Sequence, residues 1–325
     1  MPNSDPGDSV RPSSQEALVG RYAPSPTGRI HAGNIFASLV AFIVARRSGG
    51  HMAMRIEDLD PDRSKQAYID AIFRDYELLG LEWEGEAVYQ SKRREAYEDA
   101  FRRIRAGHRV YECFCTRADI HAASAPHRGE KAVYPGTCRA LTAEQRRLRI
   151  EGGRRPAWRL EVPPVRIGLV DGLQGAYGQW LDRDCGDFII KRNDGAFAYQ
   201  LAVVVDDAAQ GVTSVVRGVD LLPSTPQQIF LQRCLGLVTP AYAHVPLLVA
   251  KRDRRLSKRD RDAGMEELLG RYKTAEGILG HIAYRAGLIS DDAPTSAEEL
   301  VSCARLDALA GKIQIPWNGA AHERD

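Results

Sequence analysis

The segment at residues 21–34 combines residue types that can hold a phosphate group. It reads RYAPSPTGRIHAGN, in which two prolines stiffen the backbone and two glycines let a ligand approach it closely. Apolar residues with helical spacing follow at once, so the free amides of a helix N-terminus would face the ligand. His31 stands at this helix start, where it can donate to a phosphate oxygen or simply cap the helix. Three residues of the segment are therefore candidate triphosphate ligands: His31, Gly33 and Asn34.

A second candidate element is the basic pentamer RLSKR at residues 255–259. A lysine in a mobile basic loop can follow negative charge as it develops on a transferring phosphoryl or pyrophosphate group. Taken alone, such a pentamer is more often solvated surface. Taken together with residues 21–34, it makes Lys258 a candidate catalytic residue and phosphate ligand beside His31.

Half of the six cysteines gather in one short stretch, as Cys113-Phe114-Cys115 and, further on, Cys138. Two thiolates one residue apart, with a third about twenty residues later, indicate a tetrahedral zinc site. Three reduced, buried cysteines without metal are the alternative. The chemistry alone leaves the fourth ligand open among three residues: His121, His127 and Tyr134.

The elements around the first segment predict how these residues are positioned. An apolar run at residues 18–23 reads as a strand, a helix follows from Gly33, and residues 51–56 read as a second strand. A strand, helix and strand of this length form a βαβ unit with parallel strands and a right-handed connection. Both strands then end at one edge of the sheet, which places the phosphate-binding segment beside Glu57.

Further elements follow along the chain. Helices are expected at residues 64–79 and 91–105, and strands at 188–190, 198–205 and 213–217. Pro226, at a permitted early position, indicates another helix start. From about residue 264 the chain reads as helical, with a capping box at residues 296–299.

Residues 108–187 lose this alternating rhythm. They contain the cysteine cluster, a short helix that a capping box at residues 142–145 begins, and a Gly-rich stretch at 168–186. We interpret residues 108–187 as an inserted module.

Composition narrows the class of protein. With 325 residues and 44% hydrophobic composition, the chain is long enough for about two domains. The net charge is only +2, so the molecule as a whole is not a strongly basic protein that would enclose nucleic acid by charge alone. The N-terminus lacks the apolar core of a signal peptide, and the longest apolar run, at residues 39–45, is too short for a bilayer. We expect a cytoplasmic protein with no membrane partner, whose thiols stay reduced.

Together these elements resemble the class I aminoacyl-tRNA synthetases, whose two signature motifs are called HIGH and KMSKS. The sequence around these motifs resembles the glutamyl-tRNA synthetase family more closely still. Residues 21–34 match the first motif of that family, and RIEDLD at 55–60 and VRGVDL at 216–221 match other motifs of its catalytic domain. The resemblance covers roughly residues 18–260. One departure is Arg255, where the usual motif begins with lysine.

The resemblance implies an α/β fold: a class I synthetase Rossmann-type parallel sheet, an inserted zinc-containing module like an acceptor-binding domain, and a small C-terminal helical region. The expected boundaries are a disordered tail at 1–17, the first half of the catalytic domain at 18–107, the insertion at 108–187, the second half with the KMSKS-like loop at 188–262, and the helical region at 263–325.

A glutamate site needs a cation for a carboxylate and an anion for the α-ammonium group. Arg21 ends the first predicted strand and Glu57 follows the second, and the planar guanidinium of arginine fits a carboxylate. The family resemblance implies that Glu57 takes the ammonium group and that the remaining glutamate-binding residues are Arg21, Tyr22, Ala23, Pro24, Ser25, Tyr199 and Arg217. From the residues alone, core packing is the default interpretation for Tyr199, and Arg217 could equally form a surface ion pair with Asp220 or Glu57.

The resemblance also implies the cofactors. ATP would arrive with Mg²⁺, and its phosphates would meet His31, Gly33, Asn34 and Lys258. One structural Zn²⁺ per chain would be held by four residues, with tyrosine as the fourth ligand: Cys113, Cys115, Tyr134 and Cys138.

The short C-terminal region leads to an expectation about which group accepts the glutamate. It ends about 65 residues after Arg259, too few for the anticodon-reading region of a full-length glutamyl-tRNA synthetase. It therefore resembles truncated paralogues in that family, which implies a monomeric ligase that transfers L-glutamate to queuosine in the anticodon stem-loop of tRNA(Asp). The basic stretches 92–109 and 251–261 are candidates for RNA phosphate contact. The alternatives are a truncated synthetase that charges a tRNA 3′ end and a catalytically silent RNA-binding paralogue.

Overall fold

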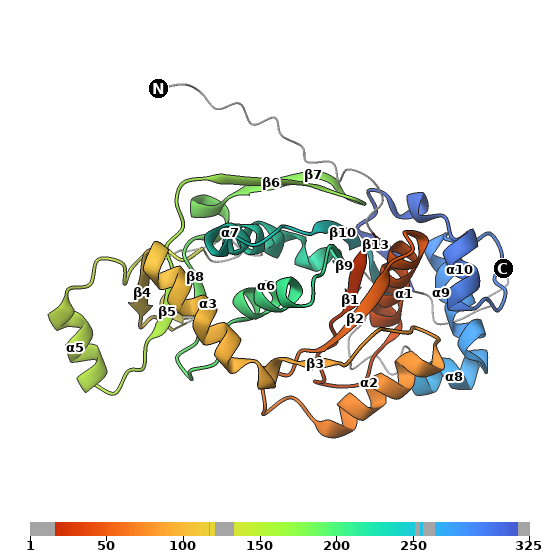
Figure 1. Cartoon of the computed structure of the whole chain (residues 1–325), viewed down its shortest axis with the longest axis horizontal. Helices are drawn as coiled ribbons and strands as arrows, with labels where there is room; N and C mark the ends of the chain where they lie inside the picture. The colour runs from red at the N-terminus through yellow and green to blue at the C-terminus, as the bar shows by residue number, and fades with distance from the viewer. Residues whose placement is uncertain (1–16, 117, 121–132, 251–253, 256–263, 318–325) are drawn as a thin grey trace.

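The computed structural model describes residues 17–116, 118–120, 133–250, 254–255 and 264–317. Several predicted features lie outside the described residues: residues 1–16 of the predicted tail at 1–17, the candidate ligands His121 and His127, and Lys258 with most of its basic stretch. The molecule is elongated, with the inserted module at one end and the C-terminal helices at the other (Figure 1).

The predicted βαβ unit is present. Strands β1 (Val19–Tyr22) and β2 (His51–Ile56) are parallel, and helix α1 (Ala32–Arg47) connects them. Strand β3 (Val88–Tyr89) extends the sheet in parallel beyond β2. The chain passes so close to itself between α1 and β2 that a Cβ atom on Gly50 would lie 1.9 Å from the carbonyl oxygen of Leu18. Only glycine fits this approach.

The second half of the sheet comes from a distant part of the chain. Strands β9 (Ser214–Gly218) and β10 (Ala241–Val245) are parallel, and the backbone amide of Thr213, just before β9, donates to the carbonyl of Val19 in β1 at 2.9 Å. Helix α7 (Thr225–Leu235) begins with proline in its first turn, as predicted, and ends at Gly236 in the left-handed conformation.

One predicted strand is wrong. Residues 198–205 lie at and within helix α6 (Tyr199–Ala209). Its apolar stretch is buried almost without interruption, together with Asp206 and Asp207, so no polar face marks the helical period. A continuous apolar run with three valines favours a strand by propensity, and packing against α7 and α3 overrides that preference.

The other predicted helices are present as α2 (Gln66–Leu78) and α3 (Arg94–Gly107), with the short helix η1 (Gln90–Lys92) before α3. Buried side chains of α3 pack with those of α6 and α7 in a large apolar core.

The inserted region builds its own antiparallel sheet from β4 (Val110–Cys113), β5 (Ala157–Leu160) and β8 (Phe188–Lys191). Strand β8, expected to open the second catalytic half, thus pairs with the inserted module. Helix α5 (Ala143–Glu151) carries its predicted capping box and buries no side chain. The Gly-rich stretch forms a long hairpin, β6 (Arg166–Asp171) and β7 (Gly175–Trp180), followed by the turn η2 (Leu181–Cys185).

The C-terminal region is helical as expected, with α8 (Met265–Tyr272), α9 (Ala275–Ala286), α10 (Ala297–Cys303) and the short helix η5 (Leu306–Leu309). The predicted capping box opens α10. Strand β13 (Gln314–Pro316) returns to pair with β11 (Leu247–Ala250), whose other neighbour is β12 (Arg254–Arg255). These helices share a buried core with α1, which joins them firmly to the sheet. Within the described parts of the chain, no helix is long and apolar enough to cross a membrane.

Candidate functional site

A pocket of about 510 Å³ opens where β1, β2 and β9 end. Its walls come from the loop before α1, the first turns of α1 and α6, and the helix η3 (Val219–Ser224) that follows β9. Every described residue predicted to bind glutamate or ATP lines this one pocket: Arg21, Tyr22, Ala23, Pro24, Ser25, His31, Gly33, Asn34, Glu57, Tyr199 and Arg217. Segments that lie far apart in the sequence thus meet at the expected edge of the sheet.

His31 caps the helix at the edge of the pocket. Its Nδ1 accepts a hydrogen bond from the amide of Gly33 at 3.1 Å, and the Asn34 side chain accepts from the His31 amide at 3.2 Å. Because Nδ1 is an acceptor, a neutral His31 ring carries its proton on Nε2. The helix start therefore presents a ring donor together with its positive dipole end.

Arg21 lies at the end of β1 with 6% of its surface exposed. Its Nη1 donates to the carbonyl oxygen of Val216 at 2.9 Å, and its Nε lies 3.8 Å from Oδ1 of Asp207. Nε itself has no hydrogen-bond partner among the described residues. The guanidinium group is held in place, yet its donors are not all used.

Glu57 follows β2 and is tied to the same charge network. The fully buried Arg55 donates to Oδ1 of Asp207 at 2.6 Å and to Oε1 of Glu57 at 3.4 Å. Burial raises the pKa of Glu57 above its ordinary value, and the nearby Arg55 and Arg21 oppose that rise. The pocket therefore contains a carboxylate whose desolvation a bound cation would relieve.

Asp207 was missed from the sequence, although it faces both buried arginines. Its neighbour Asp206 accepts hydrogen bonds from three side chains that hold η1 and α3 against α6: Gln90, Arg93 and Tyr97. The available signal was an Asp-Asp pair inside an apolar run, because buried acids are rare unless paired.

Arg217 is 5% exposed at the pocket wall, so it is not a surface residue. Its Nε donates to Nε2 of His244 at 3.1 Å and its Nη2 donates to Oγ1 of Thr225 at 2.9 Å. Sequence reasoning missed His244, which has no motif of its own. Tyr199 stands in the first turn of α6, half-buried, with its pKa raised by burial and by Glu57. Its ring therefore lines the pocket and is not wholly taken up by the core.

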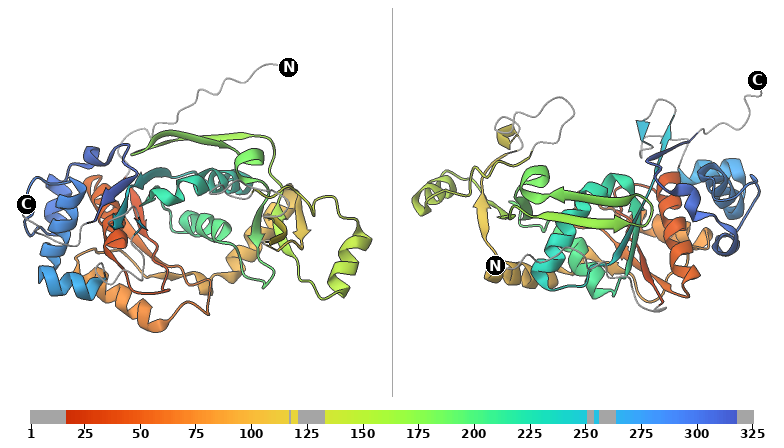
Figure 2. Two further views of the ribbon diagram at one scale, coloured as in Figure 1. Left: turned by 180° about the vertical axis from the view of Figure 1, so that it is seen from behind. Right: turned by 90° about the horizontal axis from the view of Figure 1, so that it is seen from above.

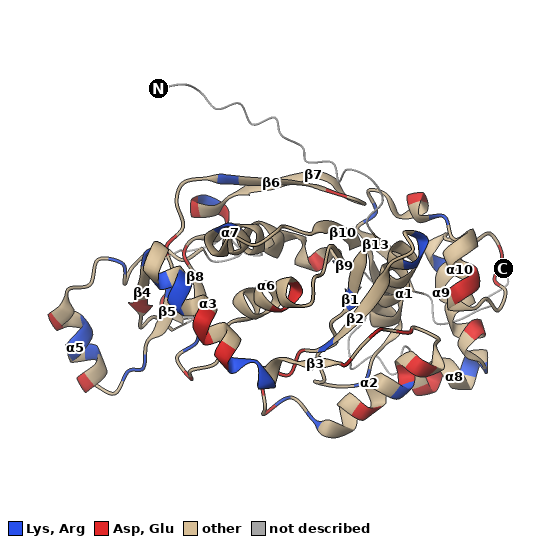
Figure 3. Ribbon diagram, in the orientation of Figure 1, with Lys and Arg blue, Asp and Glu red and all other residues tan. Residues whose placement is uncertain are grey.

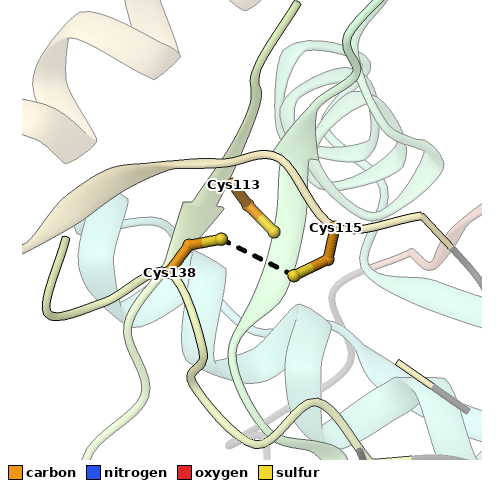
Figure 4. A group of neighbouring side chains, drawn as sticks. All are labelled: Cys113, Cys115 and Cys138. Carbon is orange, nitrogen blue, oxygen red and sulfur yellow. Dashed lines mark hydrogen bonds between the residues drawn. The ribbon is translucent and has the colours of Figure 1, made fainter. Parts of the chain in front are cut away.

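The cysteine cluster lies in the inserted sheet, apart from the pocket. Among the described residues, the sulfur atoms of Cys113, Cys115 and Cys138 lie within 4.8 Å of one another (Figure 4). Tetrahedral zinc, with Zn–S bonds of about 2.3 Å, holds its sulfur atoms roughly 3.8 Å apart. The Tyr134 hydroxyl lies 3.5 Å from Sγ of Cys113 and accepts from the Cys138 amide at 2.8 Å. The donor set therefore fits a metal, with Tyr134 at its edge.

Comparison with known proteins identifies the fold. The catalytic domain of class I tRNA synthetases (E and Q) matches residues 17–282. Among solved structures, the glutamate-tRNA synthetase of Elizabethkingia anophelis has a TM-score of 0.79 at 24% identity, over 93% of this chain and 68% of that one. The glutamate tRNA ligase of Elizabethkingia meningosepticum, solved with its amino acid, has a TM-score of 0.77 at 24% identity, over 92% and 67% of the two chains. The fold is that of a class I tRNA synthetase.

The curated relatives show to which family within this class the chain belongs. The chain is 43% identical over 311 residues to the glutamyl-Q tRNA(Asp) synthetase of Symbiobacterium thermophilum, which covers 92% of this chain and 96% of the relative. The enzyme of that name from Nitratidesulfovibrio vulgaris is 44% identical over 87% of this chain and 91% of its own length. The chain belongs to the glutamyl-Q tRNA(Asp) synthetase family, which is a family of class I synthetase-like ligases.

Proposed function

We propose that this protein activates L-glutamate with ATP and transfers it to the queuosine base in the anticodon loop of tRNA(Asp). The observation that carries the proposal is a single pocket that combines two buried arginines, one desolvated carboxylate and the N-terminus of α1. The names of the relatives supply the acceptor.

Glutamate would bind between charges of opposite sign. Arg21 and Arg217, with donors that no described residue uses, receive its carboxylates, and Glu57 receives the α-ammonium group. The main chain and side chains of Tyr22 to Ser25 and the ring of Tyr199 close the pocket around its carbon chain. A pocket that pairs every charge of the substrate rejects neutral amino acids, because they would leave a buried charge unpaired.

Activation of glutamate then depends on positioning its carboxylate against ATP more than on acid–base catalysis. A carboxylate oxygen of glutamate attacks the α-phosphorus of ATP, the bond from that phosphorus to the bridging oxygen breaks, and pyrophosphate leaves. His31, Gly33 and Asn34 at the start of α1 hold the phosphates. We assign Lys258 to the developing charge on pyrophosphate, and Mg²⁺ enters with ATP. In the second step a nucleophilic group of queuosine attacks the activated carbonyl carbon, and AMP leaves.

The inserted module would hold the RNA and a zinc ion. Cys113, Cys115, Cys138 and Tyr134 are the proposed ligands, and their place in a small separate core suits a structural ion. The proposed RNA-binding face also includes the neighbouring residues 92–109, where α3 carries arginines interspersed with acidic residues (Figure 3).

The exposed basic side chains of that stretch differ in the contacts that they already make. The side chains of Arg94 and Arg102 are 68% and 74% exposed. The guanidinium of Arg105 instead covers the ring of Trp158 at 4.6 Å. We therefore assign phosphate contact to Arg94 and Arg102. We also propose that the protein acts as a monomer.

The test is a transfer assay with ATP, labelled glutamate and three tRNA(Asp) samples: one with queuosine, one with queuosine and a blocked 3′ end, and one without queuosine. Label in the first two samples and not in the third supports the proposal. Label that disappears when the 3′ end is blocked contradicts it and indicates an ordinary synthetase. No label in any sample indicates a silent RNA-binding paralogue.

A further inference from the structure

Arg217 of the pocket and His244 are neighbours across two parallel strands. They are directly paired in the register of β9 and β10, so their side chains leave the sheet on the same face. Both are buried, His244 completely. Arg217 Nε donates to His244 Nε2 at 3.1 Å, and Thr225 Oγ1 lies 3.2 Å from the same nitrogen. The histidine is thus placed to orient the arginine.

The partners of His244 determine which of its nitrogens carries the proton. A guanidinium nitrogen can only donate, so Nε2 must be the acceptor and cannot carry hydrogen. The other ring nitrogen, Nδ1, lies 2.5 Å from Oδ2 of Asp171, a buried carboxylate that can only accept. The ring therefore carries its proton on Nδ1. Asp171 thus stabilises the tautomer with the proton on Nδ1, and this tautomer leaves Nε2 free to accept the hydrogen bond from Arg217.

The result is an arginine with one end left for a ligand. Arg217 uses Nε toward His244 and Nη2 toward Thr225, and its guanidinium carbon lies 5.4 Å from the centre of the Tyr242 ring. Its Nη1 has no hydrogen-bond partner among the described residues, although it is buried. Arginine side chains have many rotamers, so a fixed Nε contact determines where that unused end points.

Asp171 comes from an unexpected part of the chain. It lies at the tip of the β6–β7 hairpin, which runs from the inserted module along α7 to β10 (Figure 1) and is seen from above in Figure 2. Its Oδ1 accepts from the amides of Leu173, Gln174 and His244 at 2.9–3.0 Å. The Gln174 side chain donates to the carbonyl of His244 at 2.8 Å. The hairpin tip is therefore fastened to β10 by several bonds besides the carboxylate–imidazole contact.

We propose that Asp171 and His244 are positioning residues that aim Arg217 at a carboxylate of bound glutamate. The proposal rests on the proposed function, because it assigns glutamate to this pocket. It adds two residues that touch no substrate and that come from outside the predicted motifs. It also means that the inserted hairpin helps to build the amino-acid site.

The decisive variant is Asp171→Asn. Its amide oxygen can keep the three backbone hydrogen bonds, while its NH₂ group replaces the carboxylate oxygen that faces Nδ1. His244 must then accept on Nδ1 and carry its proton on Nε2, where it opposes the N–H of Arg217. Glutamate affinity, measured by calorimetry, should fall about tenfold or more, as it does when a hydrogen bond to a charged group is lost. The KM for ATP should stay within about twofold, since Arg217 contacts only glutamate in this account.

Two further variants test the histidine. His244→Gln can still offer an oxygen to Arg217, whereas His244→Phe offers none, so glutamine should restore most of the affinity that phenylalanine loses. Histidine ring nitrogen shifts, assigned by comparison with these variants, should show an Nδ1-protonated His244 in the wild type and an Nε2-protonated ring in D171N. A merely structural role would not connect this change of tautomer to a loss of glutamate affinity at an unchanged Tm. If D171N does not fold, the pair of His244 variants decides the question.

The matched control is Asp292→Asn. Asp292 makes the same kind of contact with His281, at 3.0 Å, in the C-terminal region away from the pocket. Its glutamate affinity should equal that of the wild type. Folded D171N and H244F proteins that bind glutamate as the wild type does would overturn the positioning role. Wild-type protein that binds no glutamate at all would instead overturn the proposed function.

Discussion

The substitution Glu57→Gln tests the electrostatics of the pocket most sharply. It keeps the size of the side chain and one oxygen acceptor, and it removes the negative charge that would face the α-ammonium group of glutamate. Glu57 is almost buried, with 10% of its side chain exposed. Its loss should therefore affect binding much more than the loss of a surface carboxylate.

The size of the effect follows from the distance and the surroundings. Two unit charges about 4 Å apart attract each other by about 4 kcal/mol at the effective dielectric constant of a protein site. Truncating one partner of a buried charge pair costs about 2–5 kcal/mol. The retained oxygen of glutamine places E57Q in the lower part of this range, at about 2–3.5 kcal/mol, so glutamate affinity should fall about 30- to 300-fold.

The same substitution should leave the fold intact. Burial raises the pKa of Glu57 even though Arg55 and Arg21 oppose the rise, so the charged form is unfavourable in the free protein. A neutral side chain of the same shape removes that cost, and Arg55 keeps Asp207 at 2.6 Å. The Tm of E57Q should therefore equal or exceed that of the wild type, and weaker binding could not be attributed to unfolding.

The raised pKa of Glu57 predicts the direction in which glutamate affinity changes with pH. Glutamate binding requires an ionised Glu57, so the wild-type affinity should fall as pH decreases through the raised pKa of that carboxyl group. E57Q has no such group, so the two affinities should converge at low pH and separate as pH rises. Calorimetric titrations from about pH 4.5 to 8 measure this, with the exposed Glu86→Gln as the control. A ratio that does not change with pH, or an E57Q affinity within a factor of about two of the wild type at pH 7.5, would refute the assignment.

Three further predictions concern the metal, the buried charges and the fold. Cys138→Ala should lose the bound zinc, measured by elemental analysis, while the exposed Cys303→Ala keeps it; equal metal contents would remove Cys138 from the ligand set. Asp207→Asn removes the shared anion of two buried guanidinium groups and should lower the free energy of unfolding in urea by about 3 kcal/mol; a change within experimental error would contradict the charge network. Gly50→Ala would place a Cβ atom 1.9 Å from a backbone oxygen and should lower the Tm by several degrees, whereas Gly107→Ala, with open space around it, should not; equal Tm values would count against the close approach.

The first βαβ unit and the pocket edge could be predicted because their signals are local. Residues 21–34 carry their own turn and helix-start residues, and the rule for parallel strands brings Glu57 to the same edge. The family resemblance added Tyr199 and Arg217, which have no local signal that distinguishes them from core or surface residues. The structure places both in the pocket wall.

Other features could not be predicted because their cause lies in packing. Helix α6 has neighbours on nearly every side, so its sequence lacks the period that reveals a surface helix. Asp207 contacts Arg55 across 152 residues of sequence, Asp171 contacts His244 across 73, and His244 contacts Arg217 across 27. No spacing rule connects such residues. The hairpin β6–β7 was not predicted within the Gly-rich stretch, since its alternation of side chains is weak and its strands are largely exposed.

The central claim is that the chain places glutamate on a modified base and not on a tRNA end. The most direct measurement is mass spectrometry of the nucleosides released from tRNA(Asp) after incubation with the protein, ATP and glutamate. The queuosine nucleoside should gain the mass of one glutamyl residue, and this gain should disappear with Glu57→Gln at limiting glutamate. An unchanged queuosine nucleoside, with glutamate found instead on the 3′-terminal adenosine, would contradict it.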